Sequence, residues 1–327
     1  MVFKIAADES RLDKDKKQYV MKWFTEVDAG RSPHMISYRD RVLFLGSCFA
    51  DEISSRMERY GFDVLANPFG VLYNPLSISN SLIRLFDSTP IDEGDVVMDG
   101  SVYKSIYHSS DYASADIHSL INNTTDSLIN ASEFLRKTDT VSLTFGTSWV
   151  YRRKSDRRVV SNCHKQPGDS FERFSLTVDE IVAQIAPLIE RGGTRRWFLS
   201  VSPVRHFKDG AVENMLSKSR LLLAVNELTK IFGNVVYFPS YEIVMDELRD
   251  YRFYGPDLVH LSAGAADYIW ERFADFALNS ESKELLRDYK RLYEMKSHRP
   301  LFPESPEYKG LLKRIDELES MLKKKRE

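Results

Sequence analysis

Much of the architecture follows from one segment, Val42-Leu43-Phe44-Leu45-Gly46-Ser47-Cys48-Phe49-Ala50. Its apolar half is typical of a buried strand, and the small residues that follow are typical of a turn. Residues 51–60 then have the character of a helix that ends at Gly61. The segment therefore predicts a strand–turn–helix unit in which Ser47 and Cys48 lie between the carboxyl end of a strand and the amino end of a helix.

The same alternation of strands and helices continues along the chain. Further strands are predicted at 62–66, 140–145, 197–201 and 235–239, and further helices at 75–86, 120–137, 177–190, 212–232 and 263–279. Thr177 and Glu180 have the spacing of a capping box, and residues 149–161 are typical of a hairpin. This order predicts βαβ units, that is, an α/β fold whose parallel sheet is covered on both faces.

Three regions differ in composition. Residues 1–40 are polar and form a predicted N-terminal extension, with a short amphipathic helix near 18–27, and residues 41–280 form the main domain. Residues 281–327 are a charged tail, in which a helix at 309–327 carries an apolar stripe. This stripe packs on the domain itself, on a second copy in a homodimer or on another partner. Residues 87–101 are expected to be irregular.

The composition excludes several classes of protein. The 327 residues include 43% apolar and 29% charged residues, and the net charge of −2 gives no reason to expect nucleic acid as a partner. No apolar run has the roughly 20 residues that a membrane span requires. The start shows no secretory signal, so a cytoplasmic location is expected. The two cysteines, Cys48 and Cys163, are expected to be free thiols.

A nucleophile, a base and an orienting carboxylate are present. Cys48 is the candidate nucleophile, because the helix that follows it should lower the pKa of its thiol. His260 is the candidate general base, and Asp257, three residues earlier, is the candidate group that orients it. Ser47 is the competing nucleophile. The alternative is that Cys48 is a small buried residue at a tight turn and that Asp257 and His260 are turn and surface residues.

Other residues at predicted strand ends are candidates for binding an oxyanion or a substrate. Gly70 allows backbone N–H groups to approach a ligand closely, and Ser148 adds a hydroxyl, although ordinary turn chemistry explains both. His164 and His206 follow two further strands and are expected to line the pocket or fasten loops. A zinc site built from Cys48, Cys163 and these histidines is disfavoured, because the spacing fits no zinc signature. No metal and no cofactor is predicted.

Five motifs resemble the GSCFA family: Gly46 to Ala50, Asn67 to Pro75, Gly146 to Trp149, Asn162 to Lys165 and Ser202 to His206. The resemblance spans roughly residues 40–280. The family is grouped with the SGNH hydrolases, which implies a flavodoxin-like three-layer α/β/α sandwich with about five parallel strands. It also places Asn67 among the substrate-binding motifs.

The resemblance to SGNH hydrolases implies roles for individual residues. Cys48 falls where the nucleophilic serine of that pattern lies, and Asp257 and His260 match its last block unchanged. Gly70 matches the second-block glycine. Ser148 replaces an asparagine in the third block, which puts that oxyanion donor in doubt.

The resulting expectation is an acyl esterase or acyltransferase that acts on a small acylated substrate, for example a carbohydrate. A thioester at Cys48 exchanges readily with alcohols, amines and thiols, so transfer is as credible as hydrolysis. The alternative function is a carbohydrate- or metabolite-binding module that has the same fold but no catalytic activity.

Overall fold

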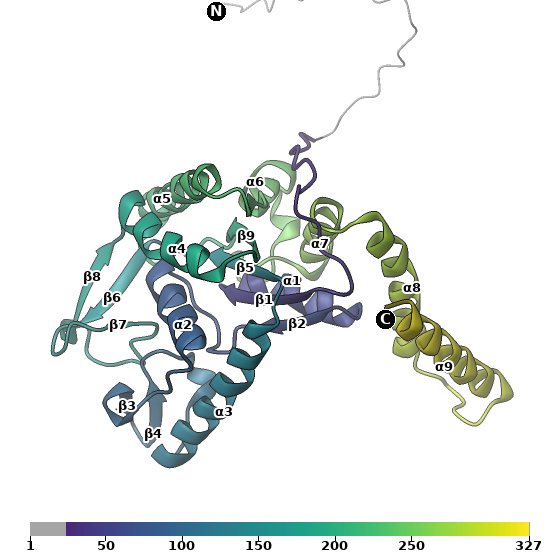
Figure 1. The fold of residues 1–327 in the computed structure, drawn as a ribbon, viewed down its shortest axis with the longest axis horizontal. Helices are drawn as coiled ribbons and strands as arrows, with labels where there is room; N and C mark the ends of the chain where they lie inside the picture. The colour runs from purple at the N-terminus through teal and green to yellow at the C-terminus, as the bar shows by residue number, and fades with distance from the viewer. Residues whose placement is uncertain (1–23, 327) are drawn as a thin grey trace, which may run out of the picture.

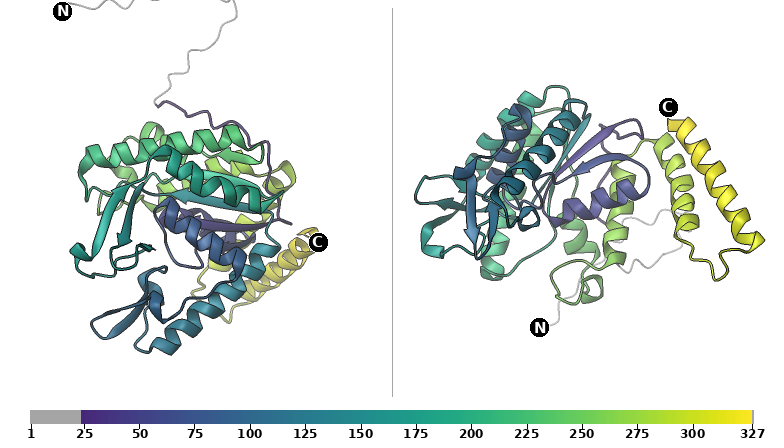
Figure 2. Two further views of the ribbon diagram at one scale, coloured as in Figure 1. Left: turned by 60° about the vertical axis from the view of Figure 1, so that its left-hand side comes forward. Right: turned by 90° about the horizontal axis from the view of Figure 1, so that it is seen from below.

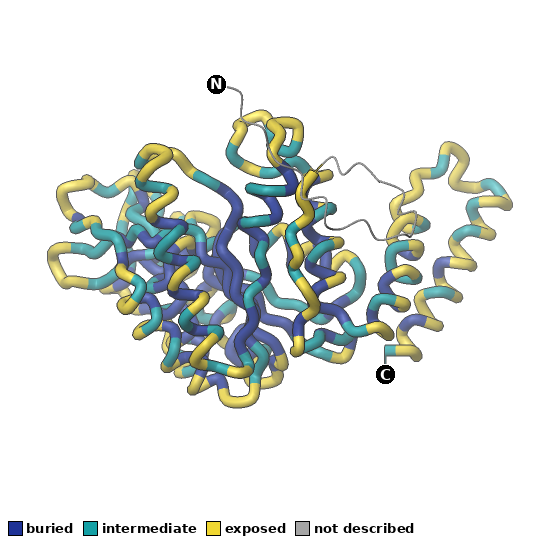
Figure 3. Tube along the Cα trace, turned by 90° about the horizontal axis from the view of Figure 1, so that it is seen from above, coloured by how far each residue is buried: buried dark blue, intermediate teal, exposed yellow. Residues whose placement is uncertain are grey.

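A computed structural model describes residues 24–326 of the chain. Its centre is a parallel sheet of five strands in the order β10-β9-β5-β1-β2 (Figure 1). These strands are β1 (Arg41–Gly46), β2 (Asp63–Ala66), β5 (Thr140–Phe145), β9 (Arg196–Val201) and β10 (Val235–Tyr237). The strands form much of the buried middle of the molecule (Figure 3). Numbered along the chain, the order is 2-1-3-4-5, which is the flavodoxin-like order.

Helices cover both faces of this sheet. One face packs against α1 (Cys48–Arg59) and α7 (Ala263–Ala277). The other face packs against α2 (Pro75–Asp87), α3 (Ile117–Arg136), α4 (Val178–Gly192) and α5 (Gly210–Ile231). The alternation within β1 explains this division, because Val42 and Phe44 belong to the first core and Leu43 and Leu45 to the second. The predicted three-layer α/β/α sandwich is confirmed.

Two small antiparallel sheets extend the domain beyond the main sheet. One pairs β3 (Val96–Asp99) with β4 (Val102–Ser105), and the other has the order β7-β6-β8, built from β6 (Trp149–Arg153), β7 (Val159–Val160) and β8 (Phe171–Ser175). The predicted hairpin at 149–161 is confirmed as β6 and β7. The expectation that residues 87–101 are irregular is wrong at 96–99, where pairing with β4 supplies a strand that periodicity alone did not indicate.

The last two helices form a hairpin that projects from the domain (Figures 1 and 2). They are α8 (Ser280–Ser297) and α9 (Pro306–Arg326), whereas the sequence predicted only the second. Ile315 and Leu322 of the predicted stripe are buried in the core that α1 and α7 share, and Leu311 and Leu318 pack against it. The stripe therefore packs within this chain.

The remaining segments close the ends of the domain. Residues 24–40 run along α7, where the Ile36 N–H donates to the Ala277 carbonyl at 2.7 Å. The helix predicted near 18–27 lies mostly outside the described residues, and 24–27 are not helical. A short turn, α6 (Ser240–Glu242), follows β10. Among residues 24–326, no helix combines the length and apolar character needed to cross a bilayer.

Candidate functional site

The candidate site lies where the chain connections diverge from the sheet. β1 and β5 are neighbours, yet β1 continues into α1 on one face, whereas the chain before and after β5 runs through helices of the other face. In open α/β sheets, such a switch point leaves a crevice at the carboxyl ends of the strands. Ser47 and Cys48 follow β1, and Gly146 and Thr147 follow β5.

The turn after β1 requires a glycine. Gly46 has φ of +144°, and a Cβ atom there would lie 2.2 Å from the Thr144 carbonyl oxygen. The Gly46 N–H donates to Asn67 Oδ1 at 2.8 Å, and Asn67 Nδ2 donates to Asp51 Oδ1 at 2.6 Å. Asn67 is buried and joins the end of β1 to the first turn of α1. It supports the turn from behind, because it does not line the pocket described next.

A cavity of about 320 Å³, called the Cys48 pocket below, opens at this turn. Its floor includes Ser47, Cys48, Gly146, Thr147 and Ser202 from the ends of β1, β5 and β9. Its walls include Tyr73 and Asn74, the β6 residues Trp149 and Tyr151, and polar groups that surround the opening: Arg173, His206, Lys208, Asp209 and Asn214. The small β7-β6-β8 sheet therefore contributes one wall.

That wall combines aromatic and cationic groups. The Arg173 guanidinium lies 4.0 Å from the centre of the Trp149 ring and 5.5 Å from that of Tyr151. Arg173 also forms an ion pair with Asp209 at 2.5 Å. Lys208 lies 5.9 Å from the Tyr151 ring. The wall therefore presents aromatic rings and charged hydrogen-bond donors to a polar ligand.

Cys48 is a half-buried free thiol at the first residue of α1. Backbone N–H groups of Cys48 and Phe49 favour its thiolate, as expected at a helix amino end. Burial outweighs them, and the nearby carboxylates of Asp51 and Glu52 add to it, so the pKa of the thiol is raised. The helix terminus acts in the expected direction, but the expected net lowering of the pKa is wrong, because burial and the two acidic residues of the first turn outweigh it.

Asp257 and His260 form a hydrogen-bonded pair. His260 Nδ1 and Asp257 Oδ2 are 2.6 Å apart, and the His260 backbone N–H donates to Asp257 Oδ1 at 2.9 Å. The hydrogen bond from His260 holds the pKa of the Asp257 carboxyl well below its usual range. Both side chains are about half exposed, at 48% and 52%. Because Nδ1 is engaged, Nε2 is the ring nitrogen left to face another group.

His206 lies between this pair and the Cys48 pocket. Its ring packs edge-on against His260 at 5.4 Å and against Tyr73 at 6.1 Å, measured between ring centres. Partial burial, with His260 nearby, lowers the pKa of His206. In the part of the chain that the structure describes, no hydrogen bond joins the Cys48 thiol to His260, and His260 does not line the pocket. His206, which lines the pocket and packs against His260, therefore connects the His–Asp pair to the pocket that contains Cys48.

Comparison with known proteins places this site in a family. The model of the GSCFA family matches residues 41–273. The chain belongs to the GSCFA family. That match begins at β1, ends inside α7, and contains every motif discussed above. No curated protein matches this chain.

Two motif residues of this GSCFA chain do not offer donors to the pocket. The Gly70 N–H donates to the Asn67 carbonyl at 2.7 Å, so it is already used within its own turn. Ser148 is fully buried, and its hydroxyl bonds to the hydroxyls of Ser175 at 2.7 Å and Ser217 at 3.1 Å. Neither residue lines the Cys48 pocket.

A third motif residue, His164, is buried elsewhere. Its Nε2 atom lies 2.7 Å from the Ser105 carbonyl oxygen. The neighbouring Cys163 lines a separate cavity of about 350 Å³. Among the described residues, no group of three or more His, Cys, Asp or Glu side chains is placed to hold a metal ion. Of the predicted site residues, the GSCFA fold thus brings Ser47, Cys48 and His206 to one pocket and sets Asp257 and His260 beside it.

Several residues in or next to the Cys48 pocket were not among the site residues predicted from the sequence. Tyr73 and Trp149 lie inside the quoted motifs, so their place next to a strand end was available as an indication. Arg173 lies on β8, a strand that was not predicted. Lys218 does not line the pocket but bonds to two carbonyl groups of its floor; it lies three residues before Leu221 on the apolar side of α5, where a lysine is unusual.

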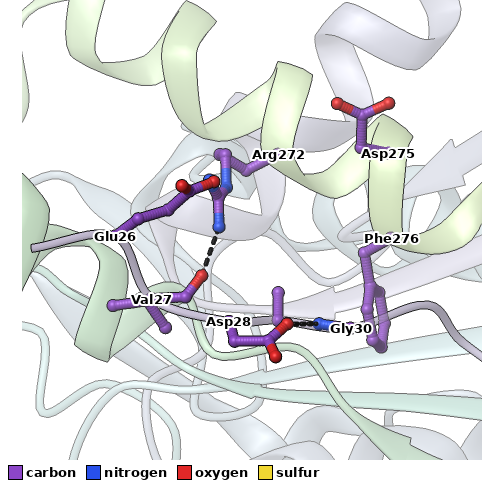
Figure 4. Close-up of a pocket in the computed structure, with 8 residues that line it drawn as sticks. Glu26, Val27, Asp28, Gly30, Arg272, Asp275 and Phe276 are labelled. Carbon is purple, nitrogen blue, oxygen red and sulfur yellow. Dashed lines mark hydrogen bonds and ion pairs between the residues drawn. The ribbon is translucent and has the colours of Figure 1, made fainter. Parts of the chain in front are cut away.

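A second hollow, of about 440 Å³, is formed by residues 26–30 and the end of α7. Figure 4 shows Arg272 reaching across it to the Val27 carbonyl, with the side chains of Glu26 and Asp275 nearby. None of the predicted site residues lines it. Its side chains fasten the N-terminal segment to α7, so the Cys48 pocket remains the candidate functional site of this GSCFA protein.

Proposed function

We propose that this protein transfers acyl groups from a small ester or thioester to water or to another acceptor, with Cys48 as the nucleophile. The observation that supports it most is the position of Cys48. Cys48 lines a pocket at the switch point of the sheet, at the amino end of α1, and the His–Asp pair packs against His206 of the same pocket. A nucleophile, a base and an orienting group are the parts that acyl transfer requires.

The raised pKa of Cys48 determines how the first step runs. A thiol that stays protonated near neutral pH needs a base, so His260 Nε2 takes the proton as Sγ bonds to the acyl carbon. His260 then returns this proton to the leaving alkoxide or thiolate. Water or an acceptor with a hydroxyl, amine or thiol next attacks the thioester while His260 Nε2 takes its proton, the bond to Sγ breaks, and His260 returns the proton to the Cys48 thiolate. Asp257 holds Nδ1 and stabilises the imidazolium.

This mechanism requires His260 to approach Cys48 when substrate binds. Hydrogen bonds between catalytic groups are often long or absent without substrate and form in the complex. The oxyanion would be held by the N–H groups of Cys48 and Phe49 and by the Ser47 hydroxyl, because the Gly70 N–H and the Ser148 hydroxyl have other partners. Ser47 is buried, and its hydroxyl has no hydrogen-bond partner within residues 24–326.

A second candidate function is a binding module without catalysis. It is favoured by two observations, the raised pKa of Cys48 and the absence of a Cys48–His260 hydrogen bond among the described residues. Trp149 and Tyr151, together with the amides of Asn74 and Asn214, are groups that suit a sugar ring.

Trapping the acyl-enzyme tests the proposal. The protein would be incubated with p-nitrophenyl acetate and with the acetyl thioester of N-acetylcysteamine, and then analysed by intact mass and peptide mapping. We expect one acetyl group on Cys48, the same in the Cys163→Ala variant and none in Cys48→Ala, with much slower formation in His260→Ala. An adduct on Ser47 would reassign the nucleophile. No adduct, together with a change of Trp149 fluorescence on titration with sugars, would support the binding module instead.

A further inference from the structure

Lys218 is a buried cation that the proposed mechanism does not use. It lies on α5, its exposed fraction is 0%, and it is among the largest fully buried side chains of the protein. Its Nζ atom donates to the Gly146 carbonyl at 2.7 Å and to the Ser202 carbonyl at 2.5 Å. Removing an ammonium group from water is costly unless it is well bonded, so these two contacts explain how the chain tolerates it.

Both carbonyl groups belong to the floor of the Cys48 pocket. Gly146 follows β5 and Ser202 follows β9, and each lines the pocket. The N–H groups of Gly146 and Thr147 donate to the Tyr73 carbonyl at 2.7 and 2.9 Å, so the segment after β5 is held from both sides. Lys218 therefore ties together two strand ends that shape the pocket, including the start of the loop that carries His206.

The charged and titratable groups around Lys218 come from several elements. Burial, together with the nearby Arg205, lowers the pKa of Lys218 to about 7, and Cys48 acts in the opposite direction. His206 is close enough for Lys218 to lower the pKa of its imidazole. The Tyr241 ring lies 5.9 Å from Nζ. Because its proton is held weakly, a new negative charge in the pocket should strengthen that hold.

We propose that Lys218 is a positioning residue of the Cys48 pocket, which fixes the ends of β5 and β9 and stabilises negative charge that forms next to Cys48. The part of this inference that concerns acyl transfer rests on the proposed function. In that reaction the charge is the oxyanion of the tetrahedral intermediate, which would form at Ser47, Cys48 and Phe49, next to the strand ends that Lys218 holds. The coupling between Lys218 and the pocket itself requires no catalysis.

A pair of alkylated proteins tests the coupling directly. In the Cys163→Ser variant, Cys48 is modified with iodoacetate, which adds a carboxylate, or with iodoacetamide, which adds a neutral amide of similar size. The titration of lysine side chains is then followed by NMR on protein labelled with ¹³C at lysine Cε. We expect the resonance that titrates near neutral pH to shift its midpoint to higher pH with iodoacetate relative to iodoacetamide. Equal midpoints would overturn the proposal.

The kcat and KM of two lysine variants provide a second, independent test. Lys218→Met keeps the length of the side chain but removes the charge and both hydrogen bonds. We expect its kcat to fall about 10²-fold, because misplaced reacting groups cost about this much, with a smaller change in KM. The control is Lys230→Met on the same helix, an exposed lysine paired with Glu227, which should leave kcat unchanged. A folded Lys218→Met protein with unchanged kcat and pH profile would contradict the proposal.

The two readouts separate this inference from the proposed function. If the wild-type protein shows no acyl transfer, the proposed function fails, and the NMR comparison alone decides whether Lys218 responds to charge at Cys48. If Lys218→Met does not fold, the alkylated pair still gives the answer, since it keeps Lys218 in place.

Discussion

Helices α1 and α4 begin with nearly the same backbone conformation but use their N-cap residues differently. Ser47 precedes α1 with φ of −70° and ψ of 171°, and Thr177 precedes α4 with φ of −77° and ψ of 167°. Thr177 forms a capping box, in which its Oγ1 accepts from the Glu180 N–H at 3.2 Å and the Glu180 carboxylate accepts from the Thr177 N–H at 2.8 Å. The Ser47 side chain makes no capping hydrogen bond.

The difference matters for stability, because a serine that caps a helix and a buried serine that does not cap one contribute differently to the free energy of folding. A serine or threonine cap stabilises a helix by about 1 kcal/mol, whereas a buried hydroxyl without a partner costs about 1–3 kcal/mol. Ser47 is 1% exposed, and none of the described residues forms a hydrogen bond with its hydroxyl. Both helices begin after a residue that could cap them, but only α4 is stabilised by such a cap. Because Ser47 lines the Cys48 pocket, its hydroxyl is available to a bound ligand.

The largest effect is expected at the residue before the cap. This residue is Leu176 at α4 but Gly46 at α1, where a Cβ atom would collide with the backbone of β5. Gly46→Ala should lower the free energy of unfolding by about 3 kcal/mol, measured by urea unfolding. In the control, Gly264→Ala on α7, a Cβ atom meets nothing within 4 Å, and stability should change by less than about 1 kcal/mol. Equal effects of the two substitutions would show that the turn before α1 is not special.

The next largest effect separates function from stability at Ser47. Ser47→Ala removes a hydroxyl that makes no hydrogen bond, so the free energy of unfolding should stay the same or rise slightly. The rate of acyl transfer should fall about 10²-fold, because an oxyanion donor is lost. Both quantities are measured on one preparation, by urea unfolding and by release of p-nitrophenol. A loss of about 1 kcal/mol with unchanged activity would mean that Ser47 is an ordinary cap.

Local sequence patterns were enough to predict one of these helix starts fully and the other only in part. Thr177 and Glu180 form the capping box that their spacing predicts, because all of its hydrogen bonds lie within four residues. The ends of β1 and β5 were also predicted, the first at Leu45, one residue before its actual end, and the second at Phe145, since apolar runs and small residues mark them. The pairing of Gly70 with Asn67 and the burial of Ser148 depend on how distant segments pack. The raised pKa of Cys48 also required knowledge of burial, which no short motif contains.

A smaller effect is expected from the charge in the first turn of α1. Asp51 and Glu52 add to burial in raising the pKa of Cys48, so at neutral pH little thiolate is present. Asp51→Asn removes one negative charge but can still accept the hydrogen bond from Asn67, so the pKa should fall. In the Cys163→Ser background, alkylation by iodoacetamide near pH 7.5 should become about threefold to tenfold faster. The two rates should converge at a pH above the pKa of the wild-type thiol.

The control for this pH profile is Asp126→Asn, an exposed residue on α3. It should leave the alkylation rate unchanged at every pH. If Asp51→Asn also leaves the rate unchanged, burial alone determines the pKa of Cys48, and the acidic first turn of α1 has no influence on the thiol.

The smallest effect is expected at the cap of α4. Thr177→Ala breaks the capping box and should lower the free energy of unfolding by about 1 kcal/mol. Acyl transfer should be unchanged at temperatures where the variant stays folded, because α4 lies away from the Cys48 pocket and none of its residues lines it. Thr177→Ser, which keeps the hydroxyl, should recover most of the stability.

The substitutions Thr177→Ala and Ser47→Ala affect equivalent N-cap positions in two helices, but the expected outcomes are opposite. Thr177→Ala should change stability, and Ser47→Ala should change activity. If both substitutions reduced stability equally and neither altered activity, the amino end of α1 would be a structural terminus like that of α4, and the site would have to depend on Cys48 and the His–Asp pair alone.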